Sequence, residues 1–147
     1  TAFLFAQAEG RDLWQSPLLP WHLFAQAVVA GAAALLIVGA VMGRGAPALA
    51  WIFLAGLLVN LFITVGGEFG IRHASHVATA AAHLITRGRY RIHYWSAVAG
   101  GLGLPILLVV FSGGSLPALA LAGLLALAGL WAYEWAFVMA PQDVPNS

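Results

Sequence analysis

Cysteine and lysine are absent from this 147-residue sequence, and charged residues make up only 7% of it. Without cysteine, the chain itself forms no disulfides, thiolate zinc sites or iron–sulfur clusters. A net charge of +1 provides no basic field for binding nucleic acid. Soluble domains carry about 25% charged residues. The deficit of charge, together with 62% hydrophobic residues, indicates a chain whose solvent is the lipid bilayer.

Long apolar runs, separated by short polar loops, predict an all-α integral membrane protein. A helix needs about 20 apolar residues to cross the hydrocarbon core. The second run is expected to continue as a helical extension to about residue 86, and Pro105 to kink the third. Together the runs predict one four-helix bundle over residues 1–147. The predicted spans are about 20–42, 48–68, 92–111 and 116–139.

The arginines divide unevenly between the two ends of the predicted bundle. One end, shared by the first loop, the loop between the second and third spans, and the C-terminus, carries most of them, whereas the other has only Arg44. The positive-inside rule therefore predicts that the arginine-rich end is cytoplasmic. The apolar residues 1–8 are too few to span a membrane, and we interpret them as the end of an earlier helix. The arginines of the first end are Arg11, Arg87, Arg89 and Arg91.

One acid, one arginine and three of the five histidines lie in residues 60–83, where the second span ends. In a continuous helix, Glu68, Arg72 and His76 would be spaced four residues apart on one face. Ionisable groups in such a place indicate proton or redox-cofactor chemistry. A quinol releases two protons as it loses two electrons, so it needs hydrogen-bond partners and a proton acceptor. We therefore predict proton handling by Glu68, Arg72, His76 and Glu134, and a quinone pocket formed by Glu68, Arg72, His73, His76 and His83.

The acidic residues have structural alternatives. Glu68 and Arg72 could neutralise each other as a pair spaced four residues apart near the membrane edge. Glu134 could reach the membrane interface between Trp131 and Trp135, instead of handling protons or contacting Arg72 across the bundle. In these cases the residues would contribute to packing and not to chemistry.

The histidines allow a different chemistry. Haem b in a helical bundle is held by histidines from two helices, and His22 with His76 is an available pair. Otherwise His22 and His93, each at the start of a span, are predicted to be interfacial residues. Gln26 and Asn60 are lone intramembrane amides, which favour hydrogen bonds between helices.

Several motifs occur in the order and spacing of one known family. One motif precedes the first span, and the others follow the acid Glu68 at the end of the second span. This series resembles the NrfD/PsrC-type polysulfide reductase membrane subunits. The motifs are LWQSPLLP (13–20), ATAAAH (78–83), TRGRY (86–90), HYW (93–95), GLP (103–105) and APQDVPNS (140–147).

The resemblance implies an eight-helix subunit made of two four-helix bundles, of which this chain would be the C-terminal one. It implies a membrane anchor of a respiratory oxidoreductase complex in a bacterial-type inner (cytoplasmic) membrane. The cofactor would be a quinone, menaquinone or ubiquinone, with no haem expected in this chain. The implied partners are the missing N-terminal half, an iron–sulfur subunit, and a catalytic subunit such as a molybdopterin enzyme. The alternatives are a haem b-binding cytochrome subunit and a structural bundle without a redox role.

Overall fold

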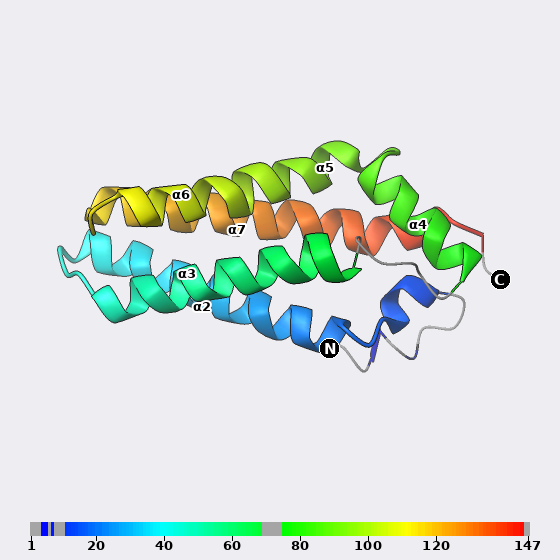
Figure 1. Ribbon diagram of the computed structural model, residues 1–147, viewed down its shortest axis with the longest axis horizontal. Coiled ribbons are helices and arrows are strands. Elements are labelled where there is room, and N and C mark those ends of the chain that lie inside the picture. Colours follow the sequence, from blue (N-terminus) through cyan, green and yellow to red (C-terminus); the bar gives the residue numbers. More distant parts are fainter. Residues whose placement is uncertain (1–3, 6, 8–10, 69–74, 146–147) are drawn as a thin grey trace.

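The computed structural model describes residues 4, 5, 7, 11–68 and 75–145, and Figure 1 shows a bundle of long helices. In the described part of the chain, four helical segments are long and apolar enough to cross a membrane. Their ends lie within a few residues of the predicted ones, which confirms the all-α membrane fold. The spans are Leu19–Val41, Pro47–Gly67, Arg91–Phe111 and Leu116–Gln142.

Two of the spans are uniform α-helix and two contain a widened π-helical segment. The first span is α2 (Leu19–Val41). The fourth is α7 (Leu116–Met139), which ends in the 3-10 turn η4 (Ala140–Gln142). The second span consists of α3 (Pro47–Leu61) and the π-helix η2 (Phe62–Glu68). The third consists of α5 (Arg91–Ser96), the π-helix η3 (Ala97–Gly103) and α6 (Leu104–Phe111).

Glycine and proline set the helix ends at one end of the bundle. Gly43 has φ +67° and ends α2, and the Arg44 N–H donates to the Gly39 carbonyl at 2.8 Å. This left-handed turn is the usual way for a helix to satisfy its last carbonyls. Pro47 lies in the first turn of α3, where its missing N–H costs nothing. The connection from α2 to α3 is therefore short, and the two spans are neighbours.

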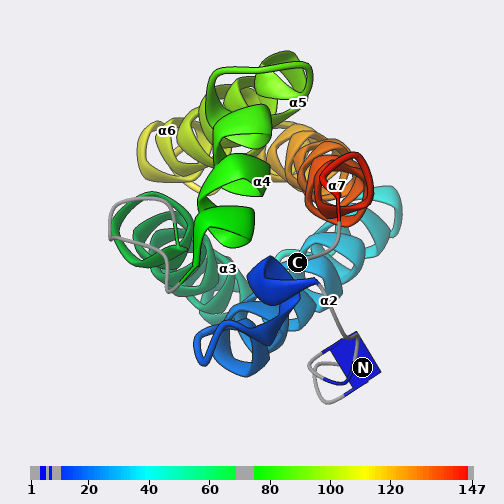
Figure 2. The same ribbon diagram turned by 90° about the vertical axis from the view of Figure 1, so that its right-hand side faces the viewer.

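The four spans surround a common core, as the end view in Figure 2 shows. The first span contacts the second and fourth, and the third contacts the fourth and second, which closes the ring. Alanine, leucine and valine side chains fill most of the centre, together with aromatic rings such as Phe53 and Phe137, whereas other large side chains such as Trp51, Phe62 and Phe111 are exposed. An apolar exterior of this kind suits lipid.

The third and fourth spans cross where two glycines meet. A Cβ atom added to Gly101 in η3 would overlap the backbone of Gly129 in α7, and the converse also holds. Small residues at such a point let helix backbones approach closely, which is the main source of helix association in lipid. The crossing fixes how η3 sits against α7.

The helical extension predicted after the second span forms a separate helix, α4 (His76–Thr86). Ser75 has an extended backbone, with φ −134° and ψ 163°, and its hydroxyl accepts a hydrogen bond from the Ala78 N–H at 3.1 Å. This cap starts a new helix, so α4 is not collinear with η2. Figure 2 shows α4 across the end of the bundle, where it contacts α5, η4 and the 3-10 turn η1 (Asp12–Gln15).

Candidate functional site

A cluster of buried polar side chains joins three spans inside the bundle. It contains His22 on α2, Asn60 near the end of α3, Thr64 in η2 and Tyr133 on α7, each at most 4% exposed. His22 Nε2 lies 2.7 Å from Asn60 Oδ1 and 3.2 Å from Thr64 Oγ1. The Tyr133 hydroxyl lies 3.4 Å from His22 Nδ1. The imidazole is therefore held by hydrogen bonds at both of its nitrogens.

The shortest of these contacts indicates the tautomer of His22. The Asn60 Oδ1 atom can only accept a hydrogen bond, so Nε2 of His22 carries the hydrogen. Nδ1 is then the acceptor for the Tyr133 hydroxyl. The two rings also meet edge to face, with centroids 5.0 Å apart. The contacts at its two nitrogens thus hold the ring of His22 in one orientation.

Both π-helical segments border a small cavity beside this cluster. The cavity measures about 10 Å³, which is room for about one water molecule. Its polar wall is formed by Asn60, Thr64 and Tyr133, and its apolar wall includes Ala97 and Leu102 of η3. π-Helical turns occur frequently at functional sites. The cluster, the cavity and both π segments therefore mark this part of the core as the candidate site.

The predicted site residues of the second span are only partly described. Glu68 is the last residue of η2, four residues after Thr64. Its side chain, and the whole of Arg72 and His73, lie outside the described residues. His76 is exposed at the start of α4. The single helical face expected for Glu68, Arg72 and His76 does not form, because the cap at Ser75 places His76 on a different helix.

The other two predicted residues lie apart from the cluster. His83 is exposed on α4. Glu134 is half-buried on α7, directly after Tyr133, and it has an interaction partner. Its neighbours Trp131 and Trp135 stack with centroids 6.0 Å apart and are largely exposed, as expected for interfacial residues. Proton handling by Glu134 and a quinone contact for His83 remain predictions.

The structure corrects the assignment of His22. The sequence predicts an interfacial residue or a haem ligand, but the side chain is 1% exposed and engaged at both ring nitrogens. Its proposed partner His76 is exposed on α4. In residues 11–68 and 75–145, no group of three histidine, cysteine or acidic residues could hold a metal ion. Asn60 is confirmed as an amide that bonds between helices, whereas the contact of Gln26 with His22, at 3.4 Å, stays within α2.

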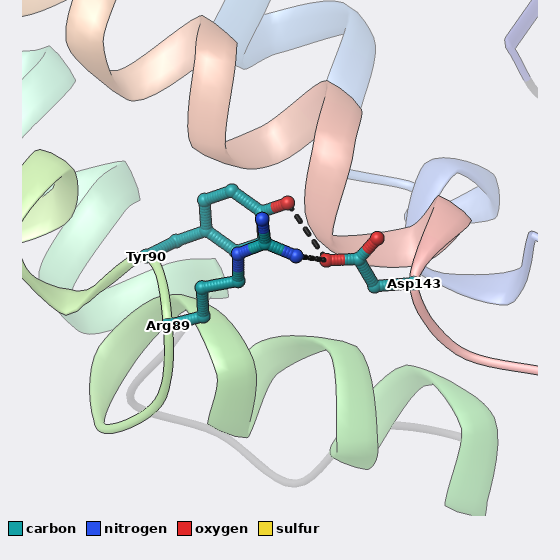
Figure 3. Close-up of polar contacts among 3 residues, drawn as sticks. All are labelled: Arg89, Tyr90 and Asp143. Carbon is teal, nitrogen blue, oxygen red and sulfur yellow. Dashed lines mark hydrogen bonds and ion pairs between the residues drawn. The ribbon is translucent and has the colours of Figure 1, made fainter.

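The C-terminal tail is fastened to the α4 end of the bundle. Figure 3 shows Asp143 Oδ2 accepting from the Tyr90 hydroxyl at 2.8 Å and from Arg89 Nη1 at 3.4 Å. Arg11 Nη1 donates to the Pro141 carbonyl at 2.6 Å. Burial raises the pKa of Tyr90 above 10.0; the hydrogen bond and negative charge of Asp143 raise it further, and Arg89 opposes them. The phenol therefore stabilises the fold below the ordinary tyrosine pKa, and this contribution is lost as the pH rises through the raised value.

The four spans and their buried polar cluster define a multi-pass α-helical membrane protein with hydrogen-bonding groups gathered in its core. The family model described as "Polysulphide reductase, NrfD" matches residues 1–146, and the chain belongs to this family. The match confirms the resemblance noted in the motifs. The family comprises membrane subunits of quinone-interacting oxidoreductase complexes. No curated protein and no solved structure matches the chain.

Proposed function

We propose that the chain is the quinone-reactive membrane subunit of a respiratory oxidoreductase complex. It would exchange electrons and protons between the quinone pool and an iron–sulfur partner subunit, which serves a catalytic subunit such as a molybdopterin enzyme. Membership of the NrfD family supports a membrane subunit that assembles with other oxidoreductase subunits. The observation that carries the proposal is the buried His22 cluster, because it links three spans next to η2, whose last residue is Glu68.

The proposal includes a quinone headgroup at the edge of the cluster. When bound, a quinone supplies two-electron, two-proton redox chemistry. The cavity of about 10 Å³ beside Asn60 and Thr64 is too small for a quinone ring. The proposal therefore places the headgroup at the Glu68 end of η2, with the His22 cluster behind it. The implied cofactor is menaquinone or ubiquinone.

The buried hydrogen bonds provide a route for protons in this proposal. Glu68 accepts protons at the headgroup. Thr64 lies four residues before it on η2, and Thr64 Oγ1 contacts His22 Nε2 at 3.2 Å. On the far side of the ring, Nδ1 contacts the Tyr133 hydroxyl. A histidine between two hydroxyls can hold and pass on a proton, because its two nitrogens exchange donor and acceptor roles.

The partner subunit would dock at the α4 end of the bundle. Arg87 and Arg91 are exposed there at the two ends of the turn that joins α4 to α5. Exposed arginines steer and orient an acidic partner surface. This side would also be the one on which electrons enter or leave the headgroup.

The test is the substitution Glu68→Gln in the assembled complex. We expect quinone-linked turnover to fall by about 100-fold, because a positioned general base contributes about that much or more. The catalytic subunit should keep its activity with a soluble artificial electron carrier, and the complex should remain assembled. Asp12→Asn, which changes another acid at the same end of the bundle, is the control and should leave both activities unchanged.

Unchanged quinone-linked turnover in Glu68→Gln would refute the proton role. Loss of the subunit from the membrane would instead support a structural part for Glu68. A reduced-minus-oxidised spectrum of the purified complex, compared with one prepared without this chain, tests the haem alternative. A haem b band that depends on this chain would overturn the proposal.

A further inference from the structure

An apolar cleft of about 340 Å³ lies at the end of the bundle opposite α4. It opens between the start of α3 and the end of α6, and its volume falls in the range of small-molecule sites. No ionisable side chain lines it, so it lacks the groups needed for the proton chemistry of a quinone headgroup. Its lining residues include Pro47, Ala50, Trp51, Leu54, Val110 and Leu119.

The walls of the cleft extend from the membrane surface into the hydrocarbon region. Pro47 begins α3 and Leu54 lies seven residues further on, which corresponds to a depth of about 10 Å. On the outer wall, Trp51 is 69% exposed and Val110 is 54% exposed. Both surfaces are exposed in the described part of the chain, where an acyl chain from the bilayer can reach them.

A single positive charge lies next to the cleft. Arg44 is exposed and directly precedes Gly45, which lines the cleft. It is the only charged residue in residues 23–67 and 97–132. The helix dipoles add little to this charge, because the N-terminal ends of α3 and α7 and the C-terminal ends of α2 and α6 lie at the same end of the bundle. An anion at this surface would therefore be attracted by the charge of Arg44.

We propose that the cleft binds one acyl chain of an anionic phospholipid, whose phosphate pairs with Arg44. The apolar walls would contact the acyl chain, and Arg44 would favour an anionic headgroup. An arginine near an anionic lipid surface contributes about 1 kcal/mol, which corresponds to a preference of about five-fold over a zwitterionic lipid. A quinone tail would fill the same walls but has no charge for Arg44 to select.

Trp51 provides the probe, because it is the tryptophan that lines the cleft. The protein, in its complex, is reconstituted in phosphatidylcholine nanodiscs that contain a small fraction of either brominated phosphatidylglycerol or brominated phosphatidylcholine. Bromine quenches nearby tryptophan, and subtracting the signal of a Trp51→Phe sample isolates the contribution of Trp51. We expect brominated phosphatidylglycerol to reach the same quenching at about one fifth of the fraction needed for brominated phosphatidylcholine.

Two variants and two controls make the test specific. Arg44→Gln removes the charge at an exposed position and Ala50→Phe fills the cleft; both should abolish the preference for phosphatidylglycerol. Arg87→Gln removes a charge from the opposite end of the bundle, and Ala55→Phe adds the same ring on the exposed face of α3. Both controls should retain the preference.

Equal quenching by the two lipids in the unmodified protein would overturn the proposal, as would a preference that survives Arg44→Gln. Removal of the quenching by added long-chain quinone, without any preference for phosphatidylglycerol, would assign the cleft to an isoprenoid tail. That result would also contradict the proposal. None of these outcomes depends on Glu68, so the test is independent of the proposed redox function.

Discussion

At the scale of single residues, the bond between His22 and Asn60 is a short polar contact in the described core. It joins α2 to α3 at 2.7 Å, and both side chains are at most 2% exposed. Neither side chain is accessible to water, and without Asn60 the Nε2 atom of His22 would keep only the longer contacts to Thr64 and Gln26. The contact therefore contributes to stability as well as holding the imidazole for its proposed task.

We expect Asn60→Leu to lower the free energy of unfolding by about 1 kcal/mol, within the range measured for hydrogen bonds between membrane helices. The matched control is Gln26→Leu, because Gln26 contacts the same imidazole at 3.4 Å from within α2. Gln26→Leu should lower the free energy of unfolding by less than Asn60→Leu does. Unfolding in mixed micelles of increasing SDS content measures both. An equal loss of stability in the two variants would show that the hydrogen bond between α2 and α3 contributes no more than the contact within α2.

The polar residues of this cluster were visible in the sequence, but their partnership was not. His22 and Gln26, like Asn60 and Thr64, are spaced four residues apart in otherwise apolar spans, which places each pair on one face. This spacing could have indicated a shared polar site. The side-chain direction of His22 could not be predicted, because a position near a helix start does not tell whether a residue faces the core or the interface. Tyr133 offered no signal beyond its aromatic neighbours.

At the scale of elements, the third span depends on a close crossing and on a π-helical segment that lies just before Pro105. In η3 the Leu104 N–H donates to the Ala99 carbonyl, five residues earlier. Pro105 has no N–H to donate to the Gly101 carbonyl, and a π turn before it relieves the clash of its ring with the preceding turn. The widened segment presents Gly101 to Gly129 of α7.

We expect Gly101→Ala to lower the free energy of unfolding by about 1–3 kcal/mol, because the new methyl group meets backbone that cannot turn aside. Gly100→Ala is the matched control. It adds the same methyl group to the same π segment with nothing within 4 Å, so it should be neutral or slightly stabilising. Thermal unfolding in detergent compares the two. Equal stability of the variants would mean that the glycine crossing does not determine the packing of these spans.

The span boundaries could be predicted because they follow from apolar runs ended by glycine and proline. The π segments could not, because they arise from how Pro105 and the glycines are accommodated within a continuous helix. The prediction of a common face for Glu68 and His76 required a chain that stays helical between these two residues. Ser75 has an extended backbone and caps α4, which begins as a separate helix. The predicted common face of Glu68 and His76 therefore does not form.

At the scale of the whole molecule, the two ends of the bundle differ in charge and in construction. The α4 end carries the arginines and the fastened tail, in which Asp143 holds Arg89 and Tyr90 (Figure 3). The opposite end has tight glycine turns and Arg44 as its charged residue. The proposed redox site belongs to the first end and the proposed lipid site to the second. The orientation of the bundle therefore decides which membrane surface meets the partner subunit.

The absence of cysteine allows this orientation to be measured with single labels. Ser115→Cys and Gln142→Cys place exposed thiols at the Arg44 end and at the α4 end, respectively. By the positive-inside rule, a membrane-impermeant maleimide added to intact spheroplasts should label Ser115→Cys, and should label Gln142→Cys only after permeabilisation. The reverse pattern would put the arginine-rich end on the outer surface. Its arginines would then be explained by docking of a partner, since insertion does not favour positive charge on that side.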